Sequence, residues 1–162
     1  MTIAIGERIP HATLNALKDG VQAVDTNDLF GGRKVVLFAV PGAFTPTCSA
    51  KHLPGFVEHF DAFRSRGIDV ACMAVNDAFV MGAWGRELQA AGKVRMLADG
   101  DAVFTKATGL TLDLTGKGLG LRSNRYSALV KNGVVTTLNV EGPGKFEVSD
   151  ATTMLAQVQA AA

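Results

Sequence analysis

The sequence has almost no excess charge of either sign and no long hydrophobic run. Its 162 residues carry 16 basic and 15 acidic side chains, for a formal net charge of +1. These charges are interspersed, so nothing indicates a nucleic-acid groove or a polybasic membrane anchor. No apolar stretch approaches the roughly 18–20 residues of a membrane span, and residues 1–7 lack the features of a signal peptide. We therefore expect a cytoplasmic protein that binds neither nucleic acid nor membrane.

Cysteine is also scarce. Cys48 and Cys72 are too few for the disulfide framework of a secreted protein, which favours a reducing compartment where cysteine serves chemistry. The hydrophobic fraction of 48% is ample for a packed core without a disulfide or a structural metal. No repeat or low-complexity linker divides the chain, so residues 1–162 are predicted to form a single domain.

Apolar segments alternate with helical periodicity along the chain. The pattern predicts helices over 49–66, 77–90, 102–108 and 150–159, and strands over 35–40, 68–75, 94–97, 126–131 and 134–140. Pro54 is expected to kink the first helix, and Asn132-Gly133 predicts a hairpin between the last two strands. Such alternation implies parallel strands, to which the hairpin adds antiparallel ones. The predicted class is α/β, a thioredoxin-like mixed sheet flanked by helices.

Cys48 has the most informative position. It follows the apolar strand 35–40 and precedes a predicted helix, and a helix N-terminus favours the thiolate, which is the nucleophilic form of cysteine. In such sheets ligand chemistry gathers at the carboxyl ends of strands. Two prolines and Thr45 shape the loop before Cys48. The sequence therefore predicts a reactive cysteine rather than one more small buried side chain.

The residues around Cys48 resemble a known family. The segment PGAFTPTC at 41–48, followed by HLPGF at 52–56, is similar to the active-site segment of peroxiredoxins of the small type II / type V branch. The likeness extends through 70–77, Trp84-Gly85 and 125–127, and so covers nearly the whole chain. It implies a thiol-specific peroxidase, acting in antioxidant defence, that reduces hydrogen peroxide and alkyl hydroperoxides without a bound cofactor or metal.

The resemblance assigns four roles. Cys48 matches the peroxidatic cysteine, which becomes a sulfenic acid, and Thr45 matches the threonine that hydrogen-bonds the peroxide. Pro41 matches the proline that shields the cysteine from water, and Arg125 matches the arginine that holds the thiolate. The roles are physically reasonable, because preorganised donors can stabilise the charge that develops along the breaking O–O bond. From the local sequence alone Arg122, three residues earlier, competes with Arg125.

His52 lies four residues after Cys48, on the same predicted helix face. A cysteine–histidine pair is compatible with a nucleophile and its base or with two metal ligands, but the sequence offers no orienting group and no further ligands. We interpret His52 as a structural or interface residue. The glycine-rich segment 116–120 is interpreted as a surface loop rather than a phosphate site, because it opens no helix.

Cys72 is ambiguous, because it lies inside the buried strand 68–75. It is interpreted as a core cysteine, with a resolving role that forms a disulfide to Cys48 as the alternative. The family that the chain resembles includes members with a resolving cysteine near the C-terminus, but the matching stretch 144–149 of this chain has no cysteine. This favours reduction of the sulfenic acid by an external thiol.

The expected reductant is glutathione with a glutaredoxin, or otherwise thioredoxin. One alternative is a general thiol–disulfide oxidoreductase, which would need a second cysteine three residues after Cys48, where Lys51 stands. The other is a non-catalytic redox-sensing binding module. The resemblance also implies a homodimer packed near the active-site loops. Phe44, Phe79 and Trp84 are candidate contacts for it, with a core position as the equal alternative for each.

Overall fold

The computed structural model describes residues 2–160. Its strands are β1 (Thr13–Leu17), β2 (Val21–Asp25), β3 (Lys34–Ala39), β4 (Ile68–Ala74), β5 (Arg95–Ala98), β6 (Thr111–Leu114), β7 (Gly120–Ser123), β8 (Tyr126–Lys131) and β9 (Val134–Val140). Its helices are α1 (Thr26–Phe30), the π-helix η1 (Cys48–His52), α2 (Leu53–Glu58), α3 (Phe60–Arg64), α4 (Ala78–Glu87), α5 (Val103–Thr108) and α6 (Ala151–Ala160).

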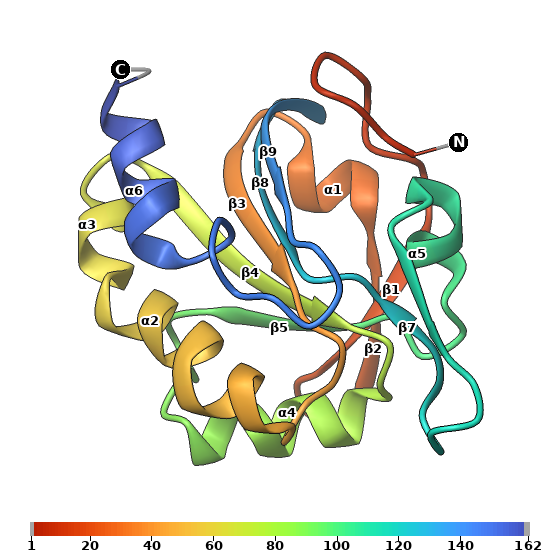
Figure 1. Cartoon of the computed structure of the whole chain (residues 1–162). Helices are drawn as coiled ribbons and strands as arrows, with labels where there is room; N and C mark the ends of the chain where they lie inside the picture. Colours follow the sequence, from red (N-terminus) through yellow and green to blue (C-terminus); the bar gives the residue numbers. More distant parts are fainter. Residues whose placement is uncertain (1, 161–162) are drawn as a thin grey trace.

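A seven-stranded sheet of order β2-β1-β5-β4-β3-β8-β9 forms the centre of the protein (Figure 1). Strands β3, β4 and β5 are parallel, whereas β8 pairs antiparallel with β3 and β9 antiparallel with β8. The predicted α/β class with a mixed sheet is confirmed. The Asn132-Gly133 turn joins β8 and β9 as predicted, and both of its residues have positive φ.

Both faces of the sheet are covered, which explains why β3 is apolar at successive positions. Val36 and Phe38 point into a core that also contains side chains of α2, α3, α4 and α6. Val35 and Leu37 point into a second core, which α1 and α5 close on the opposite face (Figure 1). The two-residue period of β3 thus places alternate side chains in separate cores.

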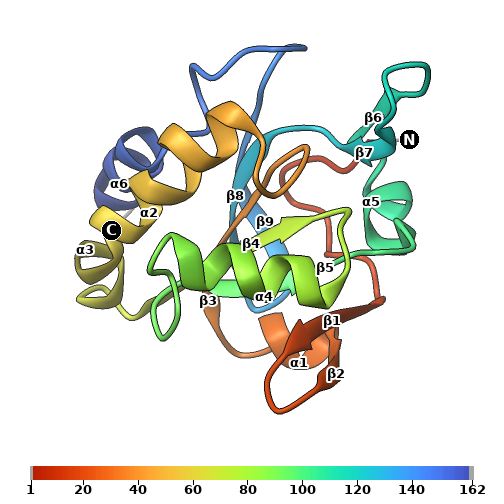
Figure 2. The ribbon, with the colours of Figure 1, turned by 90° about the horizontal axis from the view of Figure 1, so that it is seen from below.

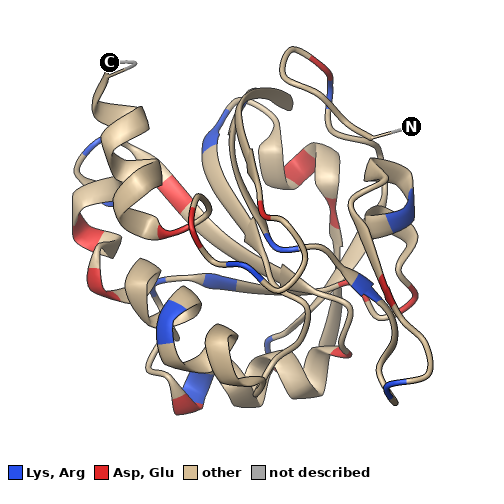
Figure 3. Cartoon of the chain, in the orientation of Figure 1, with Lys and Arg blue, Asp and Glu red and all other residues tan. Residues whose placement is uncertain are grey.

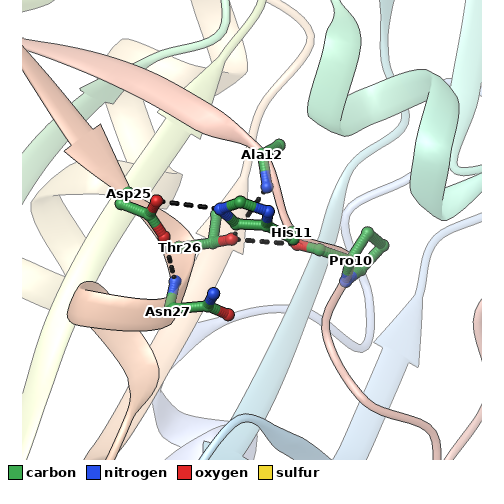
Figure 4. A network of polar contacts seen from close by, with 6 residues as sticks. All are labelled: Pro10, His11, Ala12, Asp25, Thr26 and Asn27. Carbon is green, nitrogen blue, oxygen red and sulfur yellow. Dashed lines mark hydrogen bonds and ion pairs between the residues drawn. The ribbon is translucent and has the colours of Figure 1, made fainter.

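A polar network joins α1 to the segment before β1 (Figure 4). Asp25 caps α1 by accepting from the Asn27 N–H at 2.7 Å, and its other carboxylate oxygen lies 2.8 Å from His11 Nε2. The hydrogen bond to His11 is the main cause that lowers the pKa of Asp25. The Thr26 hydroxyl donates to the carbonyl of Pro10 at 3.0 Å. These contacts fasten the N-terminal segment on the face of the sheet opposite to η1.

The helix predicted over 49–66 is divided. Winding changes from π in η1 to α in α2 beside Pro54. The Leu53 N–H bonds the Cys48 carbonyl, five residues back, and Pro54 lies in the first turn of α2, where its missing N–H is tolerated. The expected kink at Pro54 stays a prediction. The chain leaves helical geometry at His59, with φ −95° and ψ 9°.

A short helix and a two-stranded hairpin were not predicted. The short helix α1 lies in the first thirty residues, and β6 and β7 form a separate two-stranded sheet beside α5 (Figure 2). The glycine-rich segment 116–120 makes the turn of this hairpin. It follows a strand but opens no helix, which agrees with its interpretation as a surface loop. Within residues 2–160, the helices are all too short or too polar to cross a membrane.

Candidate active site

The loop between β3 and η1 is fixed by hydrogen bonds from three directions. The Ala43 N–H donates to Asn76 Oδ1 at 2.9 Å, and the Thr45 hydroxyl donates to the Gly42 carbonyl at 2.6 Å. Arg122 Nη1 donates to the Pro41 carbonyl at 3.3 Å. A Cβ atom at Gly42 would lie 2.8 Å from that same Nη1, so only glycine allows the arginine to approach this closely.

Cys48 is the first residue of η1, and its side chain is completely buried. Arg125 Nη2 lies 3.1 Å from Cys48 Sγ and donates a hydrogen bond to it. Arg125 is itself only 8% exposed. A guanidinium is a permanent cation with several fixed donors, so it can bind the sulfur and a second group at the same time.

The register of the sheet explains why these two residues meet. Phe38 and Ala39 of β3 pair with Ser127 and Tyr126 of β8, so the chain just before β8 lies beside the carboxyl end of β3. Arg125 occupies that position, where the loop to Cys48 begins. The competition with Arg122 is decided by this geometry, since Arg122 bonds carbonyl oxygens of the loops rather than sulfur.

His52 positions the arginine. Its Nδ1 accepts from Arg125 Nη1 at 2.8 Å, and its Nε2–H donates to the Ser149 carbonyl at 2.9 Å. Burial, and then the charge of Arg125, lower the pKa of His52 to about 3. The imidazole is therefore neutral at physiological pH, and its lone pair on Nδ1 remains available to Arg125. His52 therefore has a structural role, as interpreted from the sequence: it binds the same guanidinium that contacts the Cys48 sulfur.

A buried carboxylate supports the histidine from behind. Glu141 follows β9, is 3% exposed, and accepts hydrogen bonds from the backbone N–H groups of Glu147, Val148 and Ser149 at 2.8–2.9 Å. The Ser149 hydroxyl adds another at 2.7 Å. Burial alone would raise the pKa of Glu141, but these hydrogen bonds outweigh it and hold that pKa below its usual value. The carboxylate fixes the segment whose Ser149 carbonyl orients His52.

Sequence comparison identifies the family to which this constellation belongs. The model of the Redoxin family matches residues 4–155, which is nearly the whole chain. Peroxiredoxin-2B of Arabidopsis thaliana is 46% identical over 156 residues, with 94% of this chain and 96% of that protein covered. The chain is a peroxiredoxin.

Other relatives agree with this assignment. The chloroplastic peroxiredoxin-2E of Arabidopsis thaliana is 49% identical, covering 95% of this chain and 68% of that protein. A crystal structure of reduced Prx3 from Vibrio vulnificus in complex with H2O2 is 53% identical, covers 97% of this chain and 99% of that one, and has a TM-score of 0.93. The thioredoxin-like fold and the thiol peroxidase class are therefore established for this peroxiredoxin.

A cavity of about 300 Å³ opens beside Arg125 in this peroxiredoxin. Pro41 and Thr47 line it, so the predicted shielding proline lies at the mouth of the site. Leu112 and Leu114 of β6 also line it. Thr45 is half-buried and donates its hydroxyl proton to the Gly42 carbonyl, which leaves the oxygen lone pairs free to accept.

Cys72 lies within β4, opposite Phe38 of β3, and is completely buried. Both cysteines are free thiols. Burial raises the pKa of the Cys72 thiol well above its usual value, and the nearby Cys48 contributes in the same direction. A thiol with so little thiolate is a poor nucleophile, which supports the core interpretation of Cys72.

The three aromatic residues predicted as dimer contacts separate into two groups. Trp84 is completely buried and donates from Nε1 to Ser49 Oγ at 2.9 Å, so of its two interpretations the core position is the correct one. It braces η1 against α4. Phe44 and Phe79 are 50% and 64% exposed, and Phe44 adopts φ +63° in the loop before Cys48.

Glu141 was missed by sequence reasoning. A single glutamate after a strand has the pattern of an ordinary exposed charge, and its hydrogen-bond partners arise only from the fold of 147–149. Phe146, whose ring centroid lies 5.7 Å from Arg125 Cζ and 4.9 Å from the His52 ring, was missed for the same reason.

Glu141→Gln is expected to destabilise the protein at neutral pH by about 2 kcal/mol, because charge-assisted hydrogen bonds to several N–H donors are lost or weakened. The folded-state pKa of Glu141 is lowered, so its stabilisation is present above the unfolded pKa of about 4.3 and is lost as the pH falls through the folded value. Thermal melts between pH 7 and pH 3 should therefore converge for the two proteins on the acid side. Glu147→Gln, at an exposed neighbouring carboxylate, is the control. Equal effects of the two changes would contradict a special role for Glu141.

Proposed function

We propose that this peroxiredoxin reduces hydrogen peroxide and small alkyl hydroperoxides, with Cys48 as the peroxidatic residue. The observation that carries the proposal is the 3.1 Å contact between Arg125 Nη2 and the buried Cys48 Sγ. The thiolate attacks the terminal peroxide oxygen, an S–O bond forms, and the O–O bond breaks. The departing hydroxide or alkoxide takes up a proton and leaves as water or alcohol, and Cys48 becomes a sulfenic acid.

The surrounding residues have separate parts in this proposal. Arg125 stabilises the thiolate and the charge on the peroxide oxygens, while Thr45 binds the peroxide through its hydroxyl. Pro41 limits the access of water. His52 and Glu141 act on the reaction only through the orientation of Arg125, so they are positioning residues.

The sulfenic acid is then reduced by an external thiol, with glutathione and a glutaredoxin ahead of thioredoxin. The position of Cys72 supports this, because two residues in closely packed elements would have to unfold locally to form a disulfide. Attack by the glutathione thiolate on sulfur gives a mixed disulfide and water, and a second thiol releases Cys48.

The reductant is tested with Cys72→Ala, which avoids placing an unpaired hydroxyl in the buried strand. This variant should retain most of its peroxidase activity with glutathione and glutaredoxin, because Cys72 takes no part in the proposed cycle. Mass spectrometry of the peroxide-treated wild type should show glutathione on Cys48 when glutathione is present, and sulfenic then sulfinic acid when it is absent. A Cys48–Cys72 disulfide, together with inactivity of Cys72→Ala, would show that Cys72 is the resolving cysteine.

We further propose that the protein forms a homodimer through the exposed Phe44 and Phe79. Large aromatic side chains that are exposed in the monomer are typical of the core of a protein interface. Phe79→Asp should shift the sedimentation coefficient toward that of a monomer. Val103→Asp is a matched control, since Val103 is 53% exposed and also lies in the first turn of a helix, α5. A wild type that sediments as a monomer at micromolar concentration would refute the dimer.

A further inference from the structure

The cavity beside Arg125 has a one-sided charge. Its lining includes Lys117, Arg125 and Lys145 but no acidic residue, and Leu112 and Leu114 supply an apolar wall. Thr47, the neighbour of Cys48, lies on the same surface. Its volume of about 300 Å³ is at the lower end of the range for small-molecule sites. The cavity therefore adjoins the reacting sulfur and favours an anion.

The two lysines come from separate segments of the chain. Lys117 lies in the turn between β6 and β7, and Lys145 in the loop after β9; Figure 3 shows basic positions on both. Both side chains are exposed, and neither forms an ion pair within residues 2–160. The stem of Lys145 packs over Gly142, where a Cβ atom would lie 3.5 Å from Lys145 Cδ.

Two carboxylates in neighbouring segments are already engaged. Asp113 accepts from the backbone and hydroxyl of Thr115, and Glu141 is occupied by the N–H groups of 147–149. Among residues 2–160, neither lysine ammonium has an ion-pair partner, although both lysines line a cavity that leads to the active-site arginine. A negatively charged molecule in this cavity would have cations on both sides. Because the lysines are exposed to solvent, salt would screen the attraction.

We propose that this cavity is the binding site for the reducing thiol, and that Lys117 and Lys145 select a thiol that carries carboxylates. Glutathione has this chemistry, with two carboxylates and one ammonium group around a central cysteine. The inference rests on the proposed reduction by an external thiol and names the residues that recognise it. The side chain of Cys48 is fully buried, so capture by a thiol requires Thr47 and Cys48 to move toward the cavity.

The covalent step balances without a further reactant. The thiolate sulfur attacks Sγ of the Cys48 sulfenic acid, the S–S bond forms, and the S–O bond breaks. The hydroxide leaves with the proton of the thiol as water. The sulfur of Cys48 is reduced, and that of the external thiol is oxidised.

The test is a single-turnover measurement on Cys72→Ala protein treated with one equivalent of hydrogen peroxide. The rate constant for formation of the mixed disulfide is measured by mass spectrometry with glutathione and, separately, with the uncharged 2-mercaptoethanol. In Lys117→Gln/Lys145→Gln the ratio of the two constants should fall about tenfold, or two- to fivefold for each lysine, the size typical of exposed ion pairs. The dependence of the glutathione rate on salt should fall as well.

A matched control removes the same net charge elsewhere. Lys93→Gln/Lys106→Gln replaces two exposed lysines outside the cavity and should leave the ratio unchanged. An unchanged ratio in the Lys117/Lys145 variant would refute the binding site proposed for the thiol, but it would leave the proposal that glutathione is the reductant intact. If glutathione failed to react with the wild-type sulfenic acid while 2-mercaptoethanol did, the proposed reductant would fall together with the site. A loss confined to the attack on a carboxylate-bearing hydroperoxide, compared with cumene hydroperoxide, would assign the lysines to the peroxide and refute the thiol site.

Discussion

Replacing Cys48 with serine is expected to abolish peroxide consumption while leaving the fold intact. An alcohol is almost un-ionised at neutral pH and is a far weaker nucleophile than a thiolate, so the hydroxyl cannot attack the O–O bond at a useful rate. Arg125 and the π-helix around residue 48 should be retained, because the substitution replaces a single side-chain atom by a smaller one and leaves the backbone unchanged. The new hydroxyl also finds a donor in Arg125 Nη2, now 3.1 Å from Sγ, so the loss of stability should stay below about 2 kcal/mol.

The measurement is peroxide consumption with glutathione and glutaredoxin, together with a thermal melt of the same sample. Cys72→Ala is the matched control, because it removes the other buried thiol without touching Arg125. The proposal that Cys48 is the nucleophile would be wrong if Cys48→Ser turned over at the wild-type rate, or if Cys72→Ala lost activity to the same extent.

The elements that position Cys48 were predictable because their signals are local. Consecutive apolar residues indicated a strand covered on both faces, and β3 is confirmed as such. Asn132-Gly133 requires positive φ at both turn positions, a preference that the sequence itself carries, and the hairpin is confirmed. The helix predicted to begin at residue 77 is α4, and Asp77 caps it by accepting from the Val80 N–H, a preference that aspartate carries locally.

The network behind the cysteine was not predictable, since it depends on contacts between residues distant in the chain. His52 and Arg125 are 73 positions apart, and the Ser149 carbonyl lies 97 positions from His52. No periodicity encodes such pairs. The π-helix was missed because the side-chain pattern of 49–66 indicates only a helix and does not distinguish π from α winding. Trp84 was left undecided between core and interface, because an aromatic side chain on a helix gives the same sequence signal in both positions.

Arg125→Ala is expected to slow the reaction with peroxide by about 10²–10³-fold, the range seen when one preorganised donor to a developing charge is removed. Two effects add. The Cys48 sulfur loses its facing cation, and the transition state loses the donors that meet charge along the O–O bond. Reaction with iodoacetamide at neutral pH isolates the first effect, because alkylation needs the thiolate but not the peroxide donors.

Arg125→Lys and Arg122→Ala separate charge from geometry. A lysine keeps the positive charge, but its single ammonium lacks the planar fork that now bridges Cys48 Sγ and His52 Nδ1 at 3.1 and 2.8 Å. It should therefore restore alkylation more fully than peroxide reduction. Arg122→Ala removes a donor to the Pro41 carbonyl and none to sulfur, so its loss should be far smaller than that of Arg125→Ala. If Arg125→Ala left both alkylation and peroxide reduction unchanged, Arg125 would have no catalytic role, whatever its distance from the sulfur.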